Sequence, residues 1–277
     1  DVVIAGGAEK FSRLTYDGFI SLMITASEPC HPFDGRGEGL NLGEGAGVII
    51  LEQPRSAERR GGTPLGCLTG TGNACDAHHL SQPHPEGRGL RRAIEQALCR
   101  SGMQADALRF VNAHGTGTPD NDAMEMWLYQ QLFPGIPFYS TKYYTGHTLG
   151  AAGGIEAALT FGALREGEKR GESAVPMPGS YVKTFGTGKK TEHRFSAALS
   201  TSVGYGGNNV ALAFVTNAGR SSNGPHLSSR RRRVFAGAEK QISAVGIGVV
   251  GAFGCGRDDL RDALTHPQGP NATVSVR

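Results

Sequence analysis

Short apolar runs separated by glycine-rich turns dominate the first 216 residues of the chain. Residues 2–5 and 47–51 are apolar runs bounded by glycine or acidic residues, a pattern typical of fully buried strands. Residues 110–112 predict a shorter strand that runs into a glycine turn. Two further strands are expected at residues 195–200 and 209–215, joined by the turn SVGYGGN.

Helical periodicity appears between these runs. Residues 87–101 predict an amphipathic helix whose apolar positions share one face. Those positions are Leu90, Ile94, Ala97 and Leu98. Residues 122–132 have helical composition, and residues 150–164 predict a helix of small side chains that can pack closely against a neighbour. Strands and helices therefore alternate, which indicates a mixed α/β fold with ligand sites at the glycine turns.

The pattern changes after residue 216. Residues 217–240 begin with NAGRSSNGPHLSSRRRR, a polar run poor in hydrophobic residues, and are interpreted as a linker. Residues 241–277 begin a new segment, with a strand expected at 242–250 and a helix at 258–264. The chain also starts inside an apolar strand pattern, so we expect a fragment or a cleaved product.

Composition narrows the possible partners. The net charge is +3, with 28 Lys and Arg against 25 Asp and Glu, and the excess lies largely in the run at 230–233. The nearly neutral remainder argues against a nucleic acid or an anionic membrane as partner. No stretch approaches the roughly 18 apolar residues of a membrane span, and we expect no signal peptide. Five cysteines without a Cys-x-x-Cys pair favour a reducing, cytoplasmic location.

Three segments place polar side chains on glycine-rich turns: VNAHGTGTPDND at 111–122, STKYYTGHTLGAAGGIE at 140–156 and STSVGYGGNN at 200–209. Taken singly, a histidine beside glycine is more often structural. In this order and spacing, the three segments closely resemble the catalytic half of the β-ketoacyl synthases of the thiolase superfamily. PCHPFDGRGEGLNLGEGAGVIILE at 29–52 and DAHHLSQPHPEG at 76–87 resemble further blocks of that family, so the resemblance covers residues 1–216.

The resemblance implies a thiolase-like layered α-β-α architecture, of which this chain carries the C-terminal half. It implies an acyltransferase that joins an enzyme-bound acyl thioester to malonyl on acyl carrier protein, in fatty-acid or polyketide synthesis. Substrates would ride on the carrier's phosphopantetheine, with no other cofactor and no metal. Acyl carrier protein and a second ketosynthase subunit, in a homodimer or heterodimer, are the implied partners.

The family's chemistry assigns roles to four side chains. Decarboxylation of malonyl leaves an enolate, and neutral imidazoles are suited to donate N–H groups to its oxygen without attracting carboxylate ground states. By motif position these imidazoles are His114 and His147. Lys142 matches the lysine that organises them, and Glu156 matches its counter-ion, although a purely structural salt bridge is the alternative.

Tyr205 matches the position of a gating aromatic, beside a backbone N–H that serves the oxyanion hole of the acyl-enzyme. The family usually has Phe there and Thr at the position of Asn208. Tyr143 and Tyr144 replace smaller residues after the lysine, which predicts a narrower or reshaped pocket.

The family's nucleophilic cysteine is expected before residue 1, on a strand-to-helix turn that lowers its pKa. None of the cysteines at positions 30, 67, 75, 99 and 255 lies in such a context. The chain alone is therefore expected to be inactive.

Two other patterns resemble binding motifs but are not interpreted as binding sites. Cys75, His78, His79 and His84 fit no standard zinc spacing. Residues 246–251, GIGVVG, formally match a dinucleotide fingerprint, but no complete βαβ unit follows. Residues 242–264 instead resemble the start of another ketosynthase, which predicts a tandem parent.

A non-catalytic partner of a ketosynthase, of the chain-length-factor kind, is the alternative function. Retention of both histidines and Lys142 favours the enzyme. A thiolase that uses acetyl-CoA would need a second cysteine near SVGYGGNN, and that segment has none.

Overall fold

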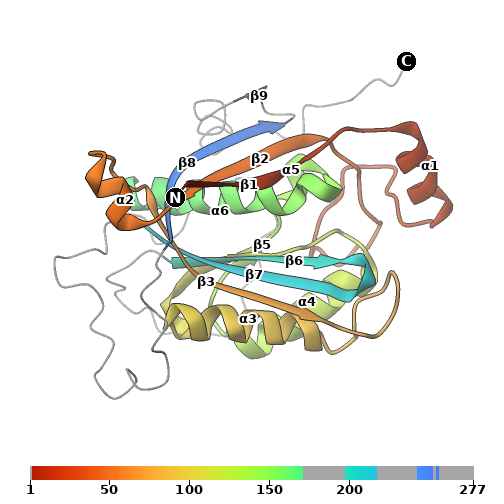
Figure 1. The fold of residues 1–277 in the computed structure, drawn as a ribbon. Helices are drawn as coiled ribbons and strands as arrows, with labels where there is room; N and C mark the ends of the chain where they lie inside the picture. Colours follow the sequence, from red (N-terminus) through yellow and green to blue (C-terminus); the bar gives the residue numbers. More distant parts are fainter. Residues whose placement is uncertain (1, 171–196, 217–241, 252–253, 256–277) are drawn as a thin grey trace.

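The computed structural model describes residues 2–170, 197–216, 242–251 and 254–255. Their strands form one nine-stranded sheet (Figure 1). Its order is β1 (Val2–Glu9), β2 (Gly45–Glu52), β8 (Ile242–Gly251), β3 (Gly66–Cys75), β7 (Asn208–Thr216), β6 (Ala197–Gly204), β4 (Leu108–Asn112) and β5 (Phe138–Tyr139), with β9 (Gly254–Cys255) beside β8. The β4 pairings with β5 and β6 are parallel, and the other pairings are antiparallel.

Helices separate and cover the strands in layers (Figure 1). The helices are α1 (Arg13–Ser21), α2 (Pro54–Arg59), α3 (Arg88–Ser101), α4 (Pro119–Leu132), α5 (Lys142–Thr145) and α6 (Ala152–Arg170), with short 3-10 turns at Ala105–Ala107, Leu149–Ala151 and Tyr205–Gly207. One face of the strands from β3 to β5 carries α3 and α4, and the other carries α6. On its far side α6 packs against β2, through Ile49 in the same buried cluster as Phe161 and Phe214. The expected α-β-α layering is confirmed.

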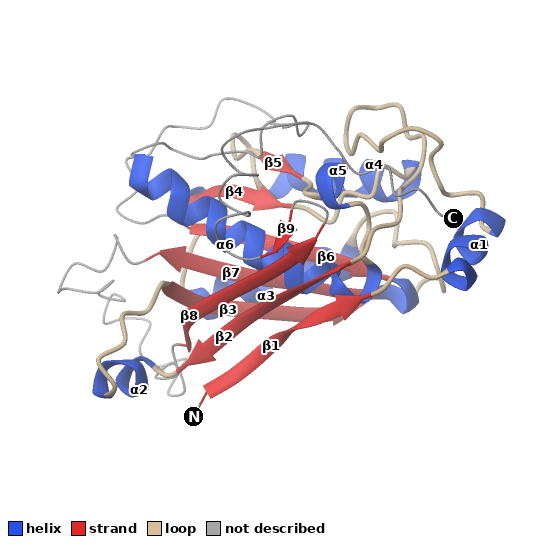
Figure 2. Cartoon of the chain, turned by 90° about the horizontal axis from the view of Figure 1, so that it is seen from above, coloured by secondary structure: helices blue, strands red, loops and turns tan. Residues whose placement is uncertain are grey.

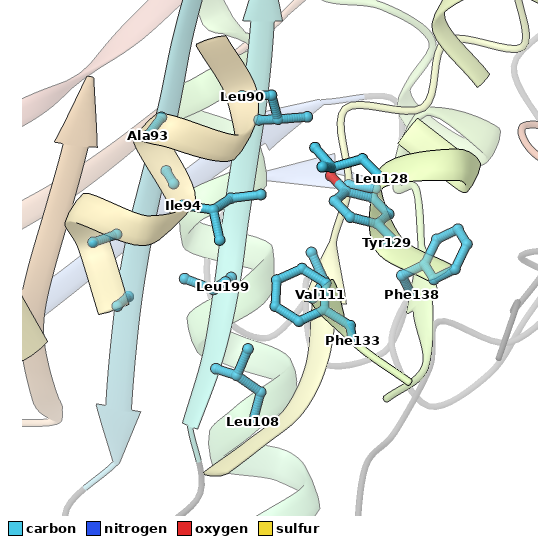
Figure 3. Close-up of a cluster of buried hydrophobic side chains, with 14 of the residues drawn as sticks. Leu90, Ala93, Ile94, Leu108, Val111, Leu128, Tyr129, Phe133, Phe138 and Leu199 are labelled. Atoms are coloured by element: carbon cyan, nitrogen blue, oxygen red, sulfur yellow. The ribbon is translucent and has the colours of Figure 1, made fainter. Parts of the chain in front are cut away.

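The second buried cluster joins α3 and α4 to the sheet. Figure 3 shows Leu90 and Ile94 of α3 facing Leu199 of β6, with Leu128 and Tyr129 of α4 alongside. Each fully buried aliphatic or aromatic side chain of this kind contributes about 1.5–3 kcal/mol. The amphipathic helix expected at 87–101 is therefore confirmed, and it ends at Gly102, which adopts the left-handed conformation typical of a helix C-terminus.

Most predicted strands and helices are present, with boundaries shifted by a few residues. The expectation that residues 2–5 are fully buried is wrong, because Val2, Val3 and Ile4 are 58%, 55% and 73% exposed. These residues are exposed because β1 lies at one edge of the sheet (Figure 2). The apolar pattern predicted a strand, but it did not predict whether other elements cover that strand.

Strand β3 was not expected from the sequence, because its glycines and threonines interrupt any apolar run. Glycine is required there by helix α3. A Cβ atom on Gly70 would lie 2.0 Å from the carbonyl oxygen of Ala97, and one on Gly72 would lie 1.8 Å from that of Ala93. Gly70 and Gly72 are therefore explained by the close packing of α3 against β3, and not by a preference of glycine for strands.

Glycine also sets the approach of α6 to β2. A Cβ atom on Gly47 would lie 2.3 Å from the backbone nitrogen of Ile155 and 2.4 Å from the carbonyl carbon of Gly154. We expect Gly47→Ala to lower the free energy of unfolding by about 2–3 kcal/mol, since backbone must move. Gly18→Ala is the control, because no atom lies within 4 Å of its Cβ position in α1. Urea denaturation of both variants checks this, and equal stability would contradict the close approach.

The segment after residue 241 joins the same sheet. Strand β8 pairs with β2 and β3, and the residues expected to form a linker at 217–240 and a helix at 258–264 lie outside the described residues. The GIGVVG segment at 246–251 is strand throughout, so the described structure contains no phosphate-binding turn within it. Among the described helices, none is long and apolar enough to cross a membrane.

Candidate active site

His114 lies in the glycine turn that follows β4. Its backbone N–H donates to Glu125 Oε1 at 2.9 Å, and the N–H of Gly115 donates to Glu125 Oε2 at 2.6 Å. Asp122 accepts from the N–H of Gly117 at 3.1 Å and from that of Phe33 at 2.7 Å. Two buried carboxylates of α4 therefore hold the turn that presents the imidazole.

Sequence reasoning missed Glu125 and Asp122. Burial raises the pKa of Asp122 to about 6, and burial likewise raises the pKa of Glu125 above its ordinary value. The sequence does contain a feature that could have pointed to these two residues. Three carboxyl residues lie in and just after TPDND, on a helix that starts directly after the histidine turn. Their backbone partners become visible only when the turn folds back over α4.

His147 is held by a different part of the chain. Its N–H donates to the carbonyl of Asn41 at 2.7 Å, and its carbonyl accepts from Gly43 at 3.1 Å. Its ring nitrogen Nδ1 accepts from the N–H of Leu149 at 3.2 Å. Leu149 has a φ of 43°, a left-handed conformation that costs a non-glycine residue about 1–3 kcal/mol. The residue that holds the His147 ring in its orientation, Leu149, thus has a strained backbone.

The two imidazoles come together as expected. Their ring centroids are 5.2 Å apart with an interplanar angle of 82°. Lys142 Nζ lies 3.1 Å from His114 Nδ1, donates to the carbonyl of His114 at 2.6 Å and contacts Glu156 Oε1. All four predicted residues, His114, His147, Lys142 and Glu156, therefore belong to one cluster.

The contacts specify where each ring carries its proton. An ammonium group can only donate, so Nδ1 of His114 is an acceptor beside Lys142. Nδ1 of His147 also accepts, from the N–H of Leu149. In each neutral ring the hydrogen is then on Nε2. The site presents two Nε2–H donors on adjacent rings.

Both rings are held neutral. Burial, the Lys142 charge and His147 lower the pKa of His114 well below its usual value. Burial and Lys142 lower the pKa of His147 to about 3. Burial raises the pKa of Glu156, and the Lys142 ammonium opposes that effect. The two imidazoles are therefore neutral, and the ion pair of the cluster is formed by Lys142 and Glu156.

The lowered pKa of His147 predicts a stability effect. The ordinary pKa is 6.5 and the folded value is about 3, so between these values the unfolded chain binds more protons. The free energy of unfolding contributed by this ring is complete above pH 6.5 and falls as the pH drops toward 3. We expect His147→Gln to weaken the pH dependence of urea denaturation between pH 7 and pH 5. An unchanged dependence would mean that the folded ring takes a proton as readily as the unfolded one.

Tyr205 lies in the turn between β6 and β7, half exposed, with its ring 6.2 Å from that of Phe19 in α1. The following Gly206 donates its N–H to the carbonyl of Leu80 at 2.6 Å. Tyr205 is thus near two other surface segments. Tyr143 contacts the ring of His31, with centroids 5.1 Å apart, and Asn208 begins β7 with an exposed side chain.

The alternative metal site has no support in the described residues, where no group of three potential ligands gathers. His79 Nδ1 accepts from Ser81 and Gln82, and His84 Nδ1 accepts from Glu86, so both rings stabilise turns. Cys30 is buried, and burial raises the pKa of its thiol, contrary to what a nucleophile needs.

Comparison with known proteins places this cluster in a family. Residues 1–57 match the family model for the β-ketoacyl synthase N-terminal domain, and residues 65–169 match that for the C-terminal domain. The chain is 39% identical over 224 residues to 3-oxoacyl-[acyl-carrier-protein] synthase 2 of Synechocystis sp., which covers 76% of this chain and 54% of the relative. The chain thus spans about half the length of the curated relatives it matches.

Solved structures agree. A complex of a ketosynthase with its chain length factor from Xenorhabdus doucetiae contains a chain that matches with 34% identity and a TM-score of 0.64, covering 78% of this chain and 53% of that one. A type II polyketide acyl-carrier protein in complex with its ketosynthase, bound to the hexaketide, matches with 25% identity and a TM-score of 0.65, covering 78% and 56%. With both domain models matched and the histidine pair assembled on a layered α/β fold, the chain belongs to the β-ketoacyl synthase family of the thiolase superfamily.

Proposed function

We propose that this chain supplies the decarboxylation site of a 3-oxoacyl-[acyl-carrier-protein] synthase. The reaction is the condensation of an acyl group, carried as a thioester on a cysteine, with malonyl on acyl carrier protein. The observation that carries the proposal is the pair of adjacent neutral rings of His114 and His147. Because Nδ1 of each ring is an acceptor in a contact of its own, Nε2–H is the donor that each ring can offer.

In the proposed reaction, the bond between the malonyl α-carbon and its carboxylate breaks and carbon dioxide leaves. The electron pair moves onto the thioester enolate, whose oxygen accepts from the two Nε2–H groups. The enolate carbon then attacks the acyl thioester carbonyl, and the cysteine thiolate leaves. Each well-placed donor to such an oxygen is worth about 3 kcal/mol of barrier.

Lys142 and Glu156 act as positioning residues in this proposal. The Lys142 ammonium keeps Nδ1 of His114 an acceptor, and its charge lowers the pKa of both rings. Glu156 balances the buried ammonium. Since a fixed, neutral donor needs no reorganisation as charge develops, the pair supports catalysis without contacting substrate.

Acyl carrier protein and a second ketosynthase-family subunit are the proposed partners. Named relatives support this: one solved match is a ketosynthase with its chain length factor, and another includes an acyl-carrier protein. Substrates would be carried on phosphopantetheine, without another cofactor, in the cytoplasm.

Tyr205, half exposed against Phe19, is proposed as the gating aromatic. We further propose residues 1–216 as ketosynthase and 241–277 as related to the start of another.

The nucleophilic cysteine is proposed to lie outside residues 1–277. Purified residues 1–277 should therefore form no acyl-enzyme with an acyl thioester, because the thiol of Cys30 is buried and its pKa is raised. The full reading frame should be acylated at one cysteine outside this range, as measured by intact mass and peptide mapping. Stoichiometric labelling of a cysteine within 1–277 would contradict the proposal. A frame that releases no carbon dioxide from malonyl thioester would favour a non-catalytic, chain-length-factor-like partner.

A further inference from the structure

The end of strand β1 lies against the turn that follows His147. A Cβ atom on Gly7 would lie 2.2 Å from the carbonyl oxygen of Gly150 and 3.2 Å from the Cα atom of Ala151. In Figure 1 this end of β1 lies close to α5 and α6, the helices that precede and follow the turn in the chain. Glycine at position 7 therefore lets the backbone of β1 touch the 3-10 turn Leu149–Ala151.

The side chain of Glu9, two residues further along β1, reaches the same turn. Its Oε2 atom accepts from the backbone N–H of Gly150 at 3.1 Å, across 141 positions of the sequence. A hydrogen bond to an ionised carboxylate is stronger than one between neutral groups. Glu9 therefore ties the end of an edge strand to a turn that is distant in the sequence.

This bond restrains a strained part of the backbone. Leu149 has a φ of 43°, which a residue other than glycine keeps only when surrounding contacts hold it there. The N–H of Leu149 donates to Nδ1 of His147 at 3.2 Å, and the N–H of the next residue, Gly150, donates to Glu9. The Glu9 carboxylate thus holds the residue directly after the strained one.

The turn in its strained form decides what His147 can donate. While Nδ1 accepts from Leu149, the hydrogen of the neutral ring is on Nε2. If the turn relaxes to ordinary backbone dihedrals, the Leu149 N–H no longer has to face the ring. Nδ1 can then carry the hydrogen, and in that tautomer Nε2 is an acceptor and not a donor.

From these contacts we propose that Glu9 is a positioning residue for His147. Its carboxylate holds the turn Leu149–Ala151, the Leu149 N–H keeps Nδ1 an acceptor, and Nε2–H remains the donor for the enolate oxygen. Glu9 acts through the turn. This inference rests on the proposed function and adds to it a residue from the end of the edge strand β1.

Three variants separate the hydrogen bond from other effects at position 9. Glu9→Ala removes the acceptor. Glu9→Asp keeps the charge but shortens the side chain by one methylene, so its carboxylate cannot reach Gly150 in the present geometry. Glu9→Gln loses the charge but keeps an oxygen that can accept from the same N–H.

Glu44 provides the matched control. Its Oε2 atom also accepts from a backbone N–H, that of Phe11 at 2.9 Å, two residues after Glu9 in the chain. This bond holds the segment that follows β1 and not the turn after His147. Glu44→Ala therefore removes a bond of the same kind from the same region.

The tautomer of His147 is measured in the full reading frame by NMR with nitrogen-labelled histidine, and its resonances are assigned by their loss in His147→Gln. A ring nitrogen without hydrogen resonates well downfield of one that carries it. In Glu9→Ala and Glu9→Asp the Nδ1 and Nε2 shifts should move toward each other, because the ring samples both tautomers. They should stay unchanged in Glu9→Gln and Glu44→Ala. Unchanged shifts in Glu9→Ala and Glu9→Asp, or an equal change in Glu44→Ala, would overturn the inference.

The same variants are compared in the release of carbon dioxide from a malonyl thioester. Glu9→Ala should lower kcat about tenfold, less than the roughly 10²–10³-fold expected when a donor is removed, because the ring is still present. KM should change little, since the donor acts only as charge develops, and Glu9→Gln should retain most of the rate. A changed tautomer with an unchanged rate would overturn the positioning role. If the unsubstituted frame releases no carbon dioxide, the proposed function fails, whereas the NMR shifts still decide whether Glu9 controls the His147 ring.

Discussion

In the full reading frame, His114→Ala should slow the release of carbon dioxide from a malonyl thioester by about 10²–10³-fold, while the rate of acyl loading stays unchanged. The physical reason is that the variant lacks the imidazole that donates to the enolate oxygen. The Nε2–H of His114 is available because Nδ1 is occupied by Lys142, and it acts only when negative charge develops on the enolate oxygen. Loading of the acyl group onto the cysteine does not create that charge at the same oxygen. His147→Ala should have a similar effect, since its ring is the second donor.

The measurement separates the two half-reactions. Carbon dioxide release is followed with radiolabelled malonyl thioester, and acyl loading is followed by intact mass. His79→Ala serves as the control, because this exposed histidine only closes a turn through Nδ1. A His114→Ala enzyme that loses loading and decarboxylation to the same extent would contradict the assigned role.

The second large effect is expected at the buried ion pair. Lys142 is 1% exposed and Glu156 is 2% exposed, so Lys142→Met leaves a carboxylate in the interior without its counter-charge. Breaking a buried pair in this way costs about 3–5 kcal/mol of unfolding free energy. Urea denaturation of residues 1–277 should show a loss of this size. The double variant Lys142→Met with Glu156→Gln should lose less than the sum of the single variants, because the uncompensated charge is removed.

The surface pair of Arg13 and Asp17 is the matched control. Its side chains are 91% and 59% exposed, so Arg13→Met should leave stability unchanged within error. Strictly additive losses for Lys142→Met and Glu156→Gln would show that the two buried groups do not interact as a pair. In the full reading frame, Lys142→Met should also raise the apparent pKa of His114, because the Lys142 charge is one cause of its lowered value.

The local pattern was sufficient for several parts of this fold. Leu90 and Ile94 recur at helical spacing, and both are buried in α3 as expected. The cluster of His114, His147, Lys142 and Glu156 was also anticipated, because the motif order brought family-level information that no single residue carries. By contrast, β3 escaped prediction, since Gly70 and Gly72 are selected by α3 and not by strand propensity.

The sequence by itself determined most of the strands and helices, with β3 the exception, and where the glycine turns lie. It also indicated that His114, His147, Lys142 and Glu156 share one site, because periodicity and motif spacing are recorded locally along the chain. Tertiary structure alone decided that β1 lies exposed at an edge, that β8 pairs with both β2 and β3, and that Glu125 holds the His114 turn. It also decided that both imidazoles carry their hydrogen on Nε2. The reason is that exposure, strand pairing and ring tautomer depend on contacts between residues far apart in sequence, which leave no local periodicity to read.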